Sequence, residues 1–276
     1  MQNKPLMARI MAAPHILWSI LFILAPLLFV LYYAFTDKNG AFTLGNIQAL
    51  GSASYMTIFT RSLCFALAAT VICLLIAFPL AYAISRAKPR SQKICIMLTM
   101  LPMWMNFLIR TYSIMAILED TGFLNTLLVK IGLQPLHIIN TGGAVIFGMV
   151  YNYLPFMILP IYSVMVKIDK SILEAAADLG CNSRKTMLKV VFPLSLPGVF
   201  SGITMVFVPA ISTFIISRML GGGGNLLIGD LIEMQFLGNS YNMNLGAAMS
   251  LVLMALILVS LAVMNRYSDE EGGMIV

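Results

Sequence analysis

Two acidic side chains, Asp230 and Glu233, stand three positions apart in the segment NLLIGDLIEMQFL, residues 225–237. If this segment is a short helix, residues three apart lie on one face, so both carboxylates point the same way. Such a pair attracts cations, polycations most of all, and is a candidate for the outer mouth of a cation path. An ordinary solvated helix face is the alternative.

Trp104 offers a second way to hold a cation, because a cation over an indole face gains about 0.5–2 kcal/mol. It lies deep in an apolar run, which weakens the alternative of an interfacial anchor and leaves packing as the main rival. Asn106 and Tyr112 follow in the same run. Polar side chains there either line a path or hydrogen-bond to neighbouring helices.

Arg110 is the only charged residue inside a long apolar run. A charge at the centre of a membrane helix costs about 2.5–3.5 kcal/mol on insertion scales, unless it is paired or reaches the interface. An arginine is also a poor lining for a cation path. We therefore expect a structural role, with the guanidinium bonded to carbonyl groups or to an acid such as Glu119 or Asp120.

Motifs for metal, redox and nucleotide chemistry are missing from the sequence. The four cysteines form no C-x-x-C pair and fit buried small side chains, and the two histidines form no H-E-x-x-H, which excludes a metalloprotease. No G-x-x-x-x-G-K-[ST] occurs, so this chain cannot bind ATP by a P-loop. Gly221–Gly224 lack the following lysine and fit a flexible outer loop. We expect a chain without catalytic residues.

The composition is that of a membrane protein. Of 276 residues, 60% are hydrophobic and 10% charged, against roughly 25% charged in soluble domains. A span needs about 20 apolar residues, and the first run is too long for a signal peptide. Seven of the twelve prolines lie inside the runs, as kinks or as points that flex around a pathway. We expect one all-α membrane domain, residues 1–276, with six spans at about 16–35, 62–85, 94–118, 143–166, 195–217 and 244–265.

The basic residues predict the orientation, since cytoplasmic loops carry the excess of Lys and Arg. One set of segments holds twelve: Lys4, Arg9, Arg86, Lys88, Arg90, Lys93, Lys167, Lys170, Arg184, Lys185, Lys189 and Arg266. The other set holds four: Lys38, Arg61, Lys130 and Arg218. Both termini are therefore expected in the cytoplasm. The net charge of +6 follows from this topology and does not indicate nucleic-acid binding.

A polar stretch, SILEAAADLG, separates the fourth and fifth spans. Ser171 and Glu174 fit a capping box, and Asp169 is a rival N-cap. Three alanines favour a helix, and Gly180 stands where a left-handed C-terminal cap would follow. Asn182 and Ser183 can start a second helix that runs to Pro193. The segment 169–193 is then a helix–turn–helix outside the membrane, and taken alone it fits a surface helix pair.

The sequence EAAADLGCNSRKTMLKVVFP, residues 174–193, resembles the EAA loop of ABC-importer permeases. The matching residues are Glu174, Ala175, Ala176, Gly180, Val190 and Pro193, with Phe192 where leucine is usual. LPMWMNFLIRTYS (101–113), NYLPFMILPIYSVM (152–165), PLSLPGVFSG (193–202) and GGGGNLLIGDLIEMQF (221–236) extend the likeness. Over about residues 12–266 the chain is similar to the spermidine/putrescine permeases of this family. The resemblance implies a type I importer bundle in a bacterial plasma membrane.

In that family the EAA loop is the coupling helix, which docks into a cytoplasmic ATP-binding subunit; here Glu174, Ala175, Ala176, Leu179 and Gly180 would make that contact. The resemblance implies two copies of the ATPase, a second homologous permease and an extracytoplasmic polyamine-binding protein. ATP and Mg²⁺ would bind the ATPase, and this chain would need no cofactor. A permease for another small cationic or organic solute is the alternative. A stand-alone channel or secondary carrier needs no coupling loop, and an intramembrane enzyme lacks a site.

Overall fold

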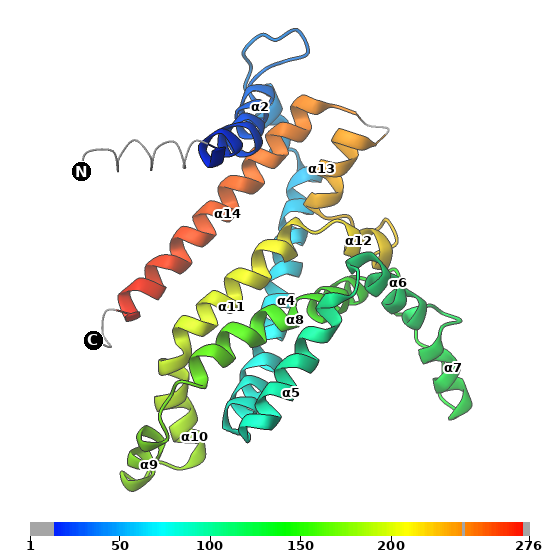
Figure 1. The fold of residues 1–276 in the computed structure, drawn as a ribbon. Helices are drawn as coiled ribbons and strands as arrows, with labels where there is room; N and C mark the ends of the chain where they lie inside the picture. Colours follow the sequence, from blue (N-terminus) through cyan, green and yellow to red (C-terminus); the bar gives the residue numbers. More distant parts are fainter. Residues whose placement is uncertain (1–13, 239–240, 273–276) are drawn as a thin grey trace, which may run out of the picture. The chain divides into compact units, whose positions relative to one another are not determined.

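The structure, a computed structural model, describes residues 14–238 and 241–272, and its regular elements are helices (Figure 1). The chain divides into two compact units: residues up to Met56 with Leu231–Leu256, and Thr57–Asp230 with the residues from Ile257 on. In chain order the elements are η1 (Ile20–Leu24), α2 (Ala25–Ala34), α3 (Gly45–Leu50), α4 (Ala53–Arg86), α5 (Pro89–Met100), η2 (Leu101–Trp104), α6 (Phe107–Leu118), α7 (Phe123–Lys130), α8 (Gly142–Met165), α9 (Lys170–Asp178), α10 (Ser183–Thr186), η3 (Met187–Val191), α11 (Phe192–Ser212), α12 (Ile215–Leu220), α13 (Ile228–Leu237) and α14 (Met243–Gly272).

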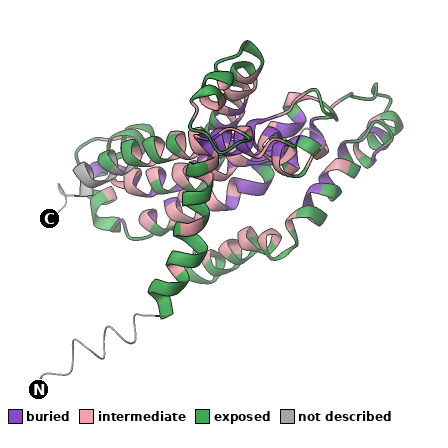
Figure 2. Cartoon of the chain, turned by 90° about the horizontal axis from the view of Figure 1, so that it is seen from above, coloured by how far each residue is buried: buried purple, intermediate pink, exposed green. Residues whose placement is uncertain are grey.

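Within residues 14–238 and 241–272, five helices are long and apolar enough to cross a membrane, and a bent pair adds a sixth if it counts as one span. The five are Pro14–Ala34, Ala53–Arg86, Gly142–Met165, Ser183–Ser212 and Met243–Met264. The all-α membrane fold is confirmed, with a count of five to six. The helix nearest the N-terminus exposes many large apolar side chains, a surface suited to lipid, whereas many residues of Gly142–Met165 are buried (Figure 2).

The third expected span is not one straight helix. Helices Pro89–Trp104 and Phe107–Lys130 meet at an angle of 93°. Pro102 lacks the N–H that a continuing helix would use, and Met105 is extended. The side-chain oxygen of Asn106 then accepts from Leu108 N at 2.9 Å and starts α6 in a new direction. The hydropathy of 94–118 is that of a span, but its backbone turns at residues 105–106.

In the smaller unit, α2 packs against the start of α14 around Ala34, Ala247 and Ala248. Asn244 fixes this contact, because its amide nitrogen donates to the Thr36 carbonyl oxygen at 2.7 Å. The buried amide thus satisfies a carbonyl just beyond the end of α2, where no helical partner is available.

In the larger unit, α8 and α11 pack closely along their length. A Cβ on Gly198 would lie 2.8 Å from the Pro160 carbonyl oxygen, and one on Gly202 would lie 2.6 Å from Met157 Sδ. Small residues allow helix backbones to approach in this way, which favours association in membranes. α8 and α11 therefore form a close pair, and the segment between them depends on its geometry.

Candidate functional site

The polar stretch between α8 and α11 forms a short helix, α9, that lies beyond the ends of both (Figure 1). Asp169 is its N-cap, with a carboxylate oxygen that accepts from Ser171 N at 3.2 Å. The capping box of Ser171 and Glu174 was therefore the wrong alternative, since the helix starts at Lys170 and places Ser171 inside its first turn. Glu174 is exposed, and Asp169 caps the helix in its place.

The other end of α9 is closed at Gly180, as predicted. Its φ is +78°, in the left-handed region that glycine adopts without steric cost. Gly180 N donates to the Ala177 carbonyl at 2.9 Å, and Cys181 N donates to the Ala176 carbonyl at 3.0 Å. This pair of bonds is a Schellman motif, which satisfies two carbonyls at the helix end.

Asn182 starts the next helix, and its side-chain oxygen accepts from Lys185 N at 2.9 Å. The second helix of the predicted pair does not stop at Pro193. α10 continues through a π-helical turn, η3, into α11, so that residues 183–212 form one rod. The helix–turn–helix is therefore a nine-residue helix joined by a tight turn to the end of a span.

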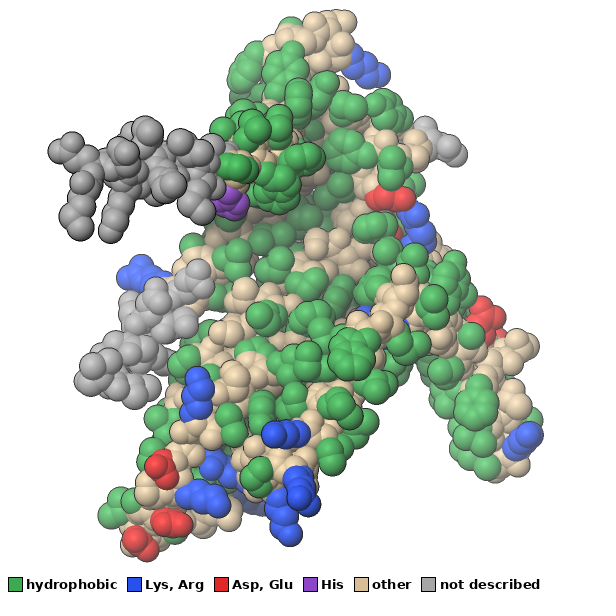
Figure 3. Space-filling model, viewed as in Figure 1, with side chains coloured by type: hydrophobic (Ala, Val, Ile, Leu, Met, Phe, Trp, Pro, Cys, Tyr) green, Lys and Arg blue, Asp and Glu red, His purple; other side chains and the backbone are tan. Residues whose placement is uncertain are grey.

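The five residues expected to couple to a partner divide by exposure. Ala176 is buried, with 6% of its surface exposed, and faces the rest of the chain. Glu174, Ala175, Leu179 and Gly180 are exposed, Leu179 to 86%. Lys, Arg, Asp and Glu side chains gather at this end of the molecule (Figure 3). An exposed leucine amid charged groups is a surface that a partner protein can cover.

Three residues predicted to line a substrate path lie at or after the break in the third span. Trp104, the last residue of η2, is 75% exposed, and Tyr112 on α6 is 56% exposed. Asn106 has a role that neither alternative included, because its side-chain oxygen caps α6. Two aromatic side chains thus stay available to a solute or a neighbouring subunit.

Arg110 is buried, at 6% exposed, and its Nη1 donates to the Pro102 carbonyl oxygen at 3.1 Å. The carbonyl alternative is therefore the one observed. Asp120, one of the two acids proposed as a partner, instead pairs with His137 Nδ1 at 2.8 Å. This hydrogen bond joins α6, which holds Arg110, to η2, which holds Pro102, and so connects the two helices on either side of the break.

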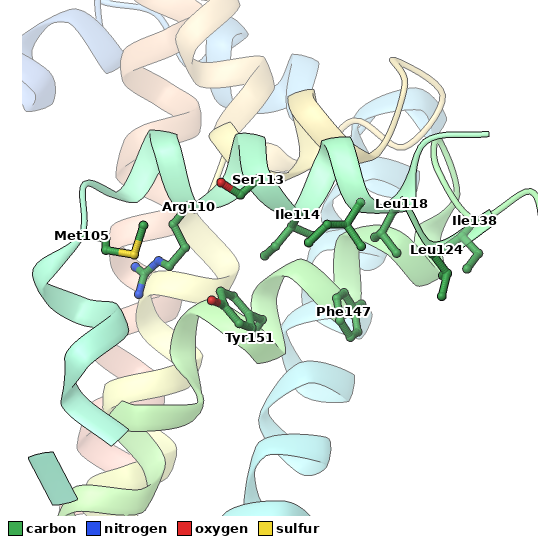
Figure 4. A pocket seen from close by; sticks show the side chains of 10 residues that line it. Met105, Arg110, Ser113, Ile114, Leu118, Leu124, Ile138, Phe147 and Tyr151 are labelled. Atoms are coloured by element: carbon green, nitrogen blue, oxygen red, sulfur yellow. The ribbon is translucent and has the colours of Figure 1, made fainter. Parts of the chain in front are cut away.

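Arg110 also borders a mainly apolar cavity of about 450 Å³ between α6 and α8, where it lies between Met105 and Tyr151 (Figure 4). Sequence reasoning missed Tyr151 and Phe147 of this lining, because residues of α8 meet α6 only through the fold. The remaining lining residues are Ser113, Ile114, Ile117, Leu118, Leu124 and Ile138.

Asp230 does not lie on a solvated face. Its side chain is 1% exposed, and Oδ2 accepts from Leu227 N at 2.8 Å, just before α13. A carboxylate in the first turn that reaches back to the preceding N–H is one half of a capping box and also favours the positive end of the helix dipole. Glu233 is half-buried. The expectation of two exposed carboxylates therefore needs correction at Asp230.

Clusters of three or more His, Cys, Asp or Glu side chains placed to hold a metal ion are absent from residues 14–238 and 241–272.

Residues 88–270 match the family described as "Binding-protein-dependent transport system inner membrane component".

The chain belongs to this family.

Two relatives are similar in sequence to most of this chain. The "Spermidine/putrescine transport system permease protein PotB" of Haemophilus influenzae is 40% identical over 252 residues, 87% of this chain and 88% of the relative. The Escherichia coli protein of that name is 37% identical over 244 residues, 86% and 88% of the two chains. The resemblance to spermidine/putrescine permeases is confirmed.

Solved structures show the permease fold. A chain of a bacterial ABC transporter for the import of alginate superposes with a TM-score of 0.78 at 17% identity, covering 97% of this chain and 96% of that one. A chain of the MetNI methionine ABC transporter gives 0.59 at 16% identity, covering 80% and 99%. The chain is a membrane protein with the fold of ABC-importer permeases.

Proposed function

We propose that this chain is the membrane-spanning permease subunit of an ATP-driven importer that carries polyamines, spermidine and putrescine, into the cytoplasm. The observation that carries the proposal is α9: an exposed helix capped at both ends by Asp169 and Gly180, in the EAA pattern of importer permeases. Membership of the family supports a transport role, and the names of relatives at 36–40% identity support the polyamine as solute.

The proposed mechanism is alternating access. Two copies of an ATP-binding subunit close on ATP, draw the coupling helices together and open the bundle to the outside, where a loaded extracytoplasmic binding protein delivers its solute. Hydrolysis resets the cycle. Leu179 supplies an apolar side chain, 86% exposed, for the docking groove of the ATPase. Glu174 and Ala175 are exposed on the same helix.

The part of the chain that the structure describes holds at most six spans, which are few for a complete pathway, so a second homologous permease would complete it. ATP and Mg²⁺ bind the ATPase, and this chain performs no covalent chemistry. The excess of basic residues supports an orientation with α9 and both termini on the cytoplasmic side of a bacterial plasma membrane, which is the orientation that contact with the ATPase requires.

Trp104 and Tyr112 are the proposed contacts for the solute. A cation that passes an indole in a partly dry pathway gains about 0.5–2 kcal/mol, with more in the driest settings. The exposure of both rings leaves them free for this contact. Glu233 is the remaining candidate for attraction from a distance, since Asp230 is buried in its own helix cap.

Uptake into proteoliposomes that hold the purified complex tests the proposal. Labelled spermidine and putrescine should accumulate with ATP and with the binding protein, whereas an amino acid and a neutral sugar should not. A complex with a hydrolysis-defective ATPase is the control. Uptake that needs neither ATP nor the ATPase would support a carrier or channel instead. ATP-driven uptake of a different solute would keep the permease role and refute the polyamine.

A further inference from the structure

The end of α4 is bonded to the end of α8, next to the coupling segment. Arg86, the last residue of α4, donates from Nη1 to the Ile168 carbonyl at 3.1 Å and from Nη2 to the Met165 carbonyl at 3.2 Å. Met165 is the last residue of α8, and Ile168 directly precedes Asp169, the N-cap of α9. One guanidinium fork therefore holds both ends of the short connection between α8 and α9.

The chemistry of this contact suits arginine. The last carbonyls of a helix have no helical partner, and they form the negative end of the helix dipole. A planar guanidinium can donate two bonds at once in a fixed geometry, which a lysine ammonium cannot reproduce. The centre of the Tyr82 ring, one turn earlier on α4, lies 5.7 Å from the guanidinium carbon, within reach of a cation–π contact.

A second link joins α5 to the same place. Gln92 donates from Nε2 to the carbonyls of Ser85 and Ala87, each at 3.0 Å, so it closes the turn between α4 and α5. Its Oε1 accepts from the Tyr162 hydroxyl of α8 at 3.3 Å. The ends of α4, α5 and α8 are thus joined by side-chain bonds rather than by apolar packing alone.

α9 has no comparable attachment of its own, since Ala176 is its one buried residue. A force on α9 passes to α8 through the connection Val166–Asp169, and α8 passes it to α11 through the close contacts at Gly198 and Gly202. The fork of Arg86 is the contact to α4 that lies beside α9; farther along the helices, Cys73 Sγ donates to the Val150 carbonyl of α8 at 3.8 Å, and the rings of Phe78 and Phe192 of α11 lie 5.5 Å apart. Without that fork, the connection could bend while α4 stays in place.

We propose that Arg86 is a positioning residue for energy coupling: it makes α4 follow the displacement of α9, and Gln92 with Tyr162 makes α5 follow too. The inference rests on the proposed function, because it assumes that an ATPase moves α9. It assigns the transmission step to a residue outside the EAA pattern, 88 positions before Glu174 (174 − 86).

The first test measures solute taken up per ATP hydrolysed, in proteoliposomes with the full complex. Arg86→Gln should keep most of the ATPase activity stimulated by loaded binding protein, while uptake per ATP falls about tenfold, the effect of losing a charge-assisted bond. The uptake per ATP of Arg86→Lys should lie between the values of wild type and Arg86→Gln, because lysine keeps the charge but cannot donate the paired bonds of the guanidinium. Arg90→Gln is the matched control, an exposed arginine in the same segment, and should behave as wild type.

A purely structural role gives another pattern: ATPase activity, uptake and thermal stability fall together, and the ratio of uptake to hydrolysis is unchanged. That result would overturn the inference. Failure of uptake in wild type would instead refute the proposed function, which keeps the two apart.

The second test does not depend on how well Arg86→Gln folds. Spin labels at the exposed positions Ala83 on α4 and Ala177 on α9 report the distance between the two helices. In wild type and in Arg90→Gln the distance should be the same without nucleotide and with ATP. In Arg86→Lys the distance should broaden or shift with ATP, whereas Tyr162→Phe, which leaves the fork of Arg86 in place, should keep the wild-type distance. An unchanged distance in Arg86→Lys would overturn the inference.

Discussion

Replacement of Gly180 tests whether the shape of the C-terminal end of α9 matters for transport. The residue has a φ of +78°, and no atom lies within 4 Å of the position that a Cβ would take. A larger side chain therefore meets no steric obstacle within the chain, and the cost of a substitution comes from the backbone alone. This separation allows the size of the side chain and its tolerance of left-handed geometry to be varied independently.

The magnitude follows from the backbone. An L-residue in the left-handed helical region costs about 1–2 kcal/mol relative to glycine, and a β-branched residue costs more. Asparagine tolerates this region, because its short polar side chain bonds locally. A short helix such as α9 is marginal by itself. A penalty of about 1–2 kcal/mol thus shifts the balance between a closed and an unravelled end about 5- to 30-fold.

We expect uptake in the order Gly180, Gly180→Asn, Gly180→Ala, Gly180→Val, with the valine variant at least about fivefold below wild type. Each variant should insert, and the ATPase should keep residual activity. The assay is labelled solute uptake in proteoliposomes, normalised to the amount of complex.

Two results would refute this reasoning. Equal loss in Gly180→Asn and Gly180→Val would mean that a partner protein touches the glycine surface, so that size and not backbone geometry decides. Near-normal uptake by Gly180→Val would mean that α9 is an ordinary surface helix.

Three further predictions concern topology and the substrate path. Cysteines introduced at Ala87 and Asn182 should react with impermeant reagents only from the cytoplasmic side. Labelling of either position in intact cells would contradict the predicted topology. Trp104→Leu should weaken apparent solute affinity about 5- to 30-fold, or about 1–2 kcal/mol, with little dependence on salt, and the affinity of Trp104→Phe should lie between those of Trp104→Leu and wild type. Equal affinity in wild type and both variants would show that Trp104 does not contact the solute. Asp230→Ala should lower thermal stability by about 0.5–2 kcal/mol at any salt, whereas Glu233→Gln should slow uptake mainly at low salt; a salt-dependent defect in Asp230→Ala would contradict its role as a cap.

Local signals in the sequence predicted local structure well. Gly180 was predicted to be a C-terminal cap and Asn182 with Ser183 to start a second helix; Gly180 closes α9, and Asn182 is the N-cap of α10. Asp169 was one of two candidates for the N-cap. Side chains that cap a helix act on atoms two or three residues away, so the sequence contains almost all the information needed.

Features that depend on distant contacts were not predictable in this way. The burial of Asp230 accompanies a bond from Ile228 N to Ser62 Oγ, between residues 166 positions apart. The cavity beside Arg110 depends on α8 lying against α6. The turn at Met105 lies in an apolar run whose hydropathy fits a straight span, because hydropathy measures length and not direction. In hindsight Pro102 and Asn106, four positions apart, were its signal.

The prolines differ in their effect on the helices that contain them. A π-helical turn ends two residues before Pro26 and two residues before Pro193; Ala25 N donates to the Ile20 carbonyl and Phe192 N donates to the Met187 carbonyl. A wider turn relieves the clash between a proline ring and the carbonyl four residues back. The remaining prolines inside long helices stay within continuous α-helix: Pro79, Pro155, Pro160, Pro197 and Pro209. Since η3 lies between α10 and α11, the rod that leaves the coupling segment contains a wide turn at its start. In the proposed coupling, motion of α9 would enter α11 through the least regular part of that rod, α8 through the connection Val166–Asp169, and α4 through the fork of Arg86.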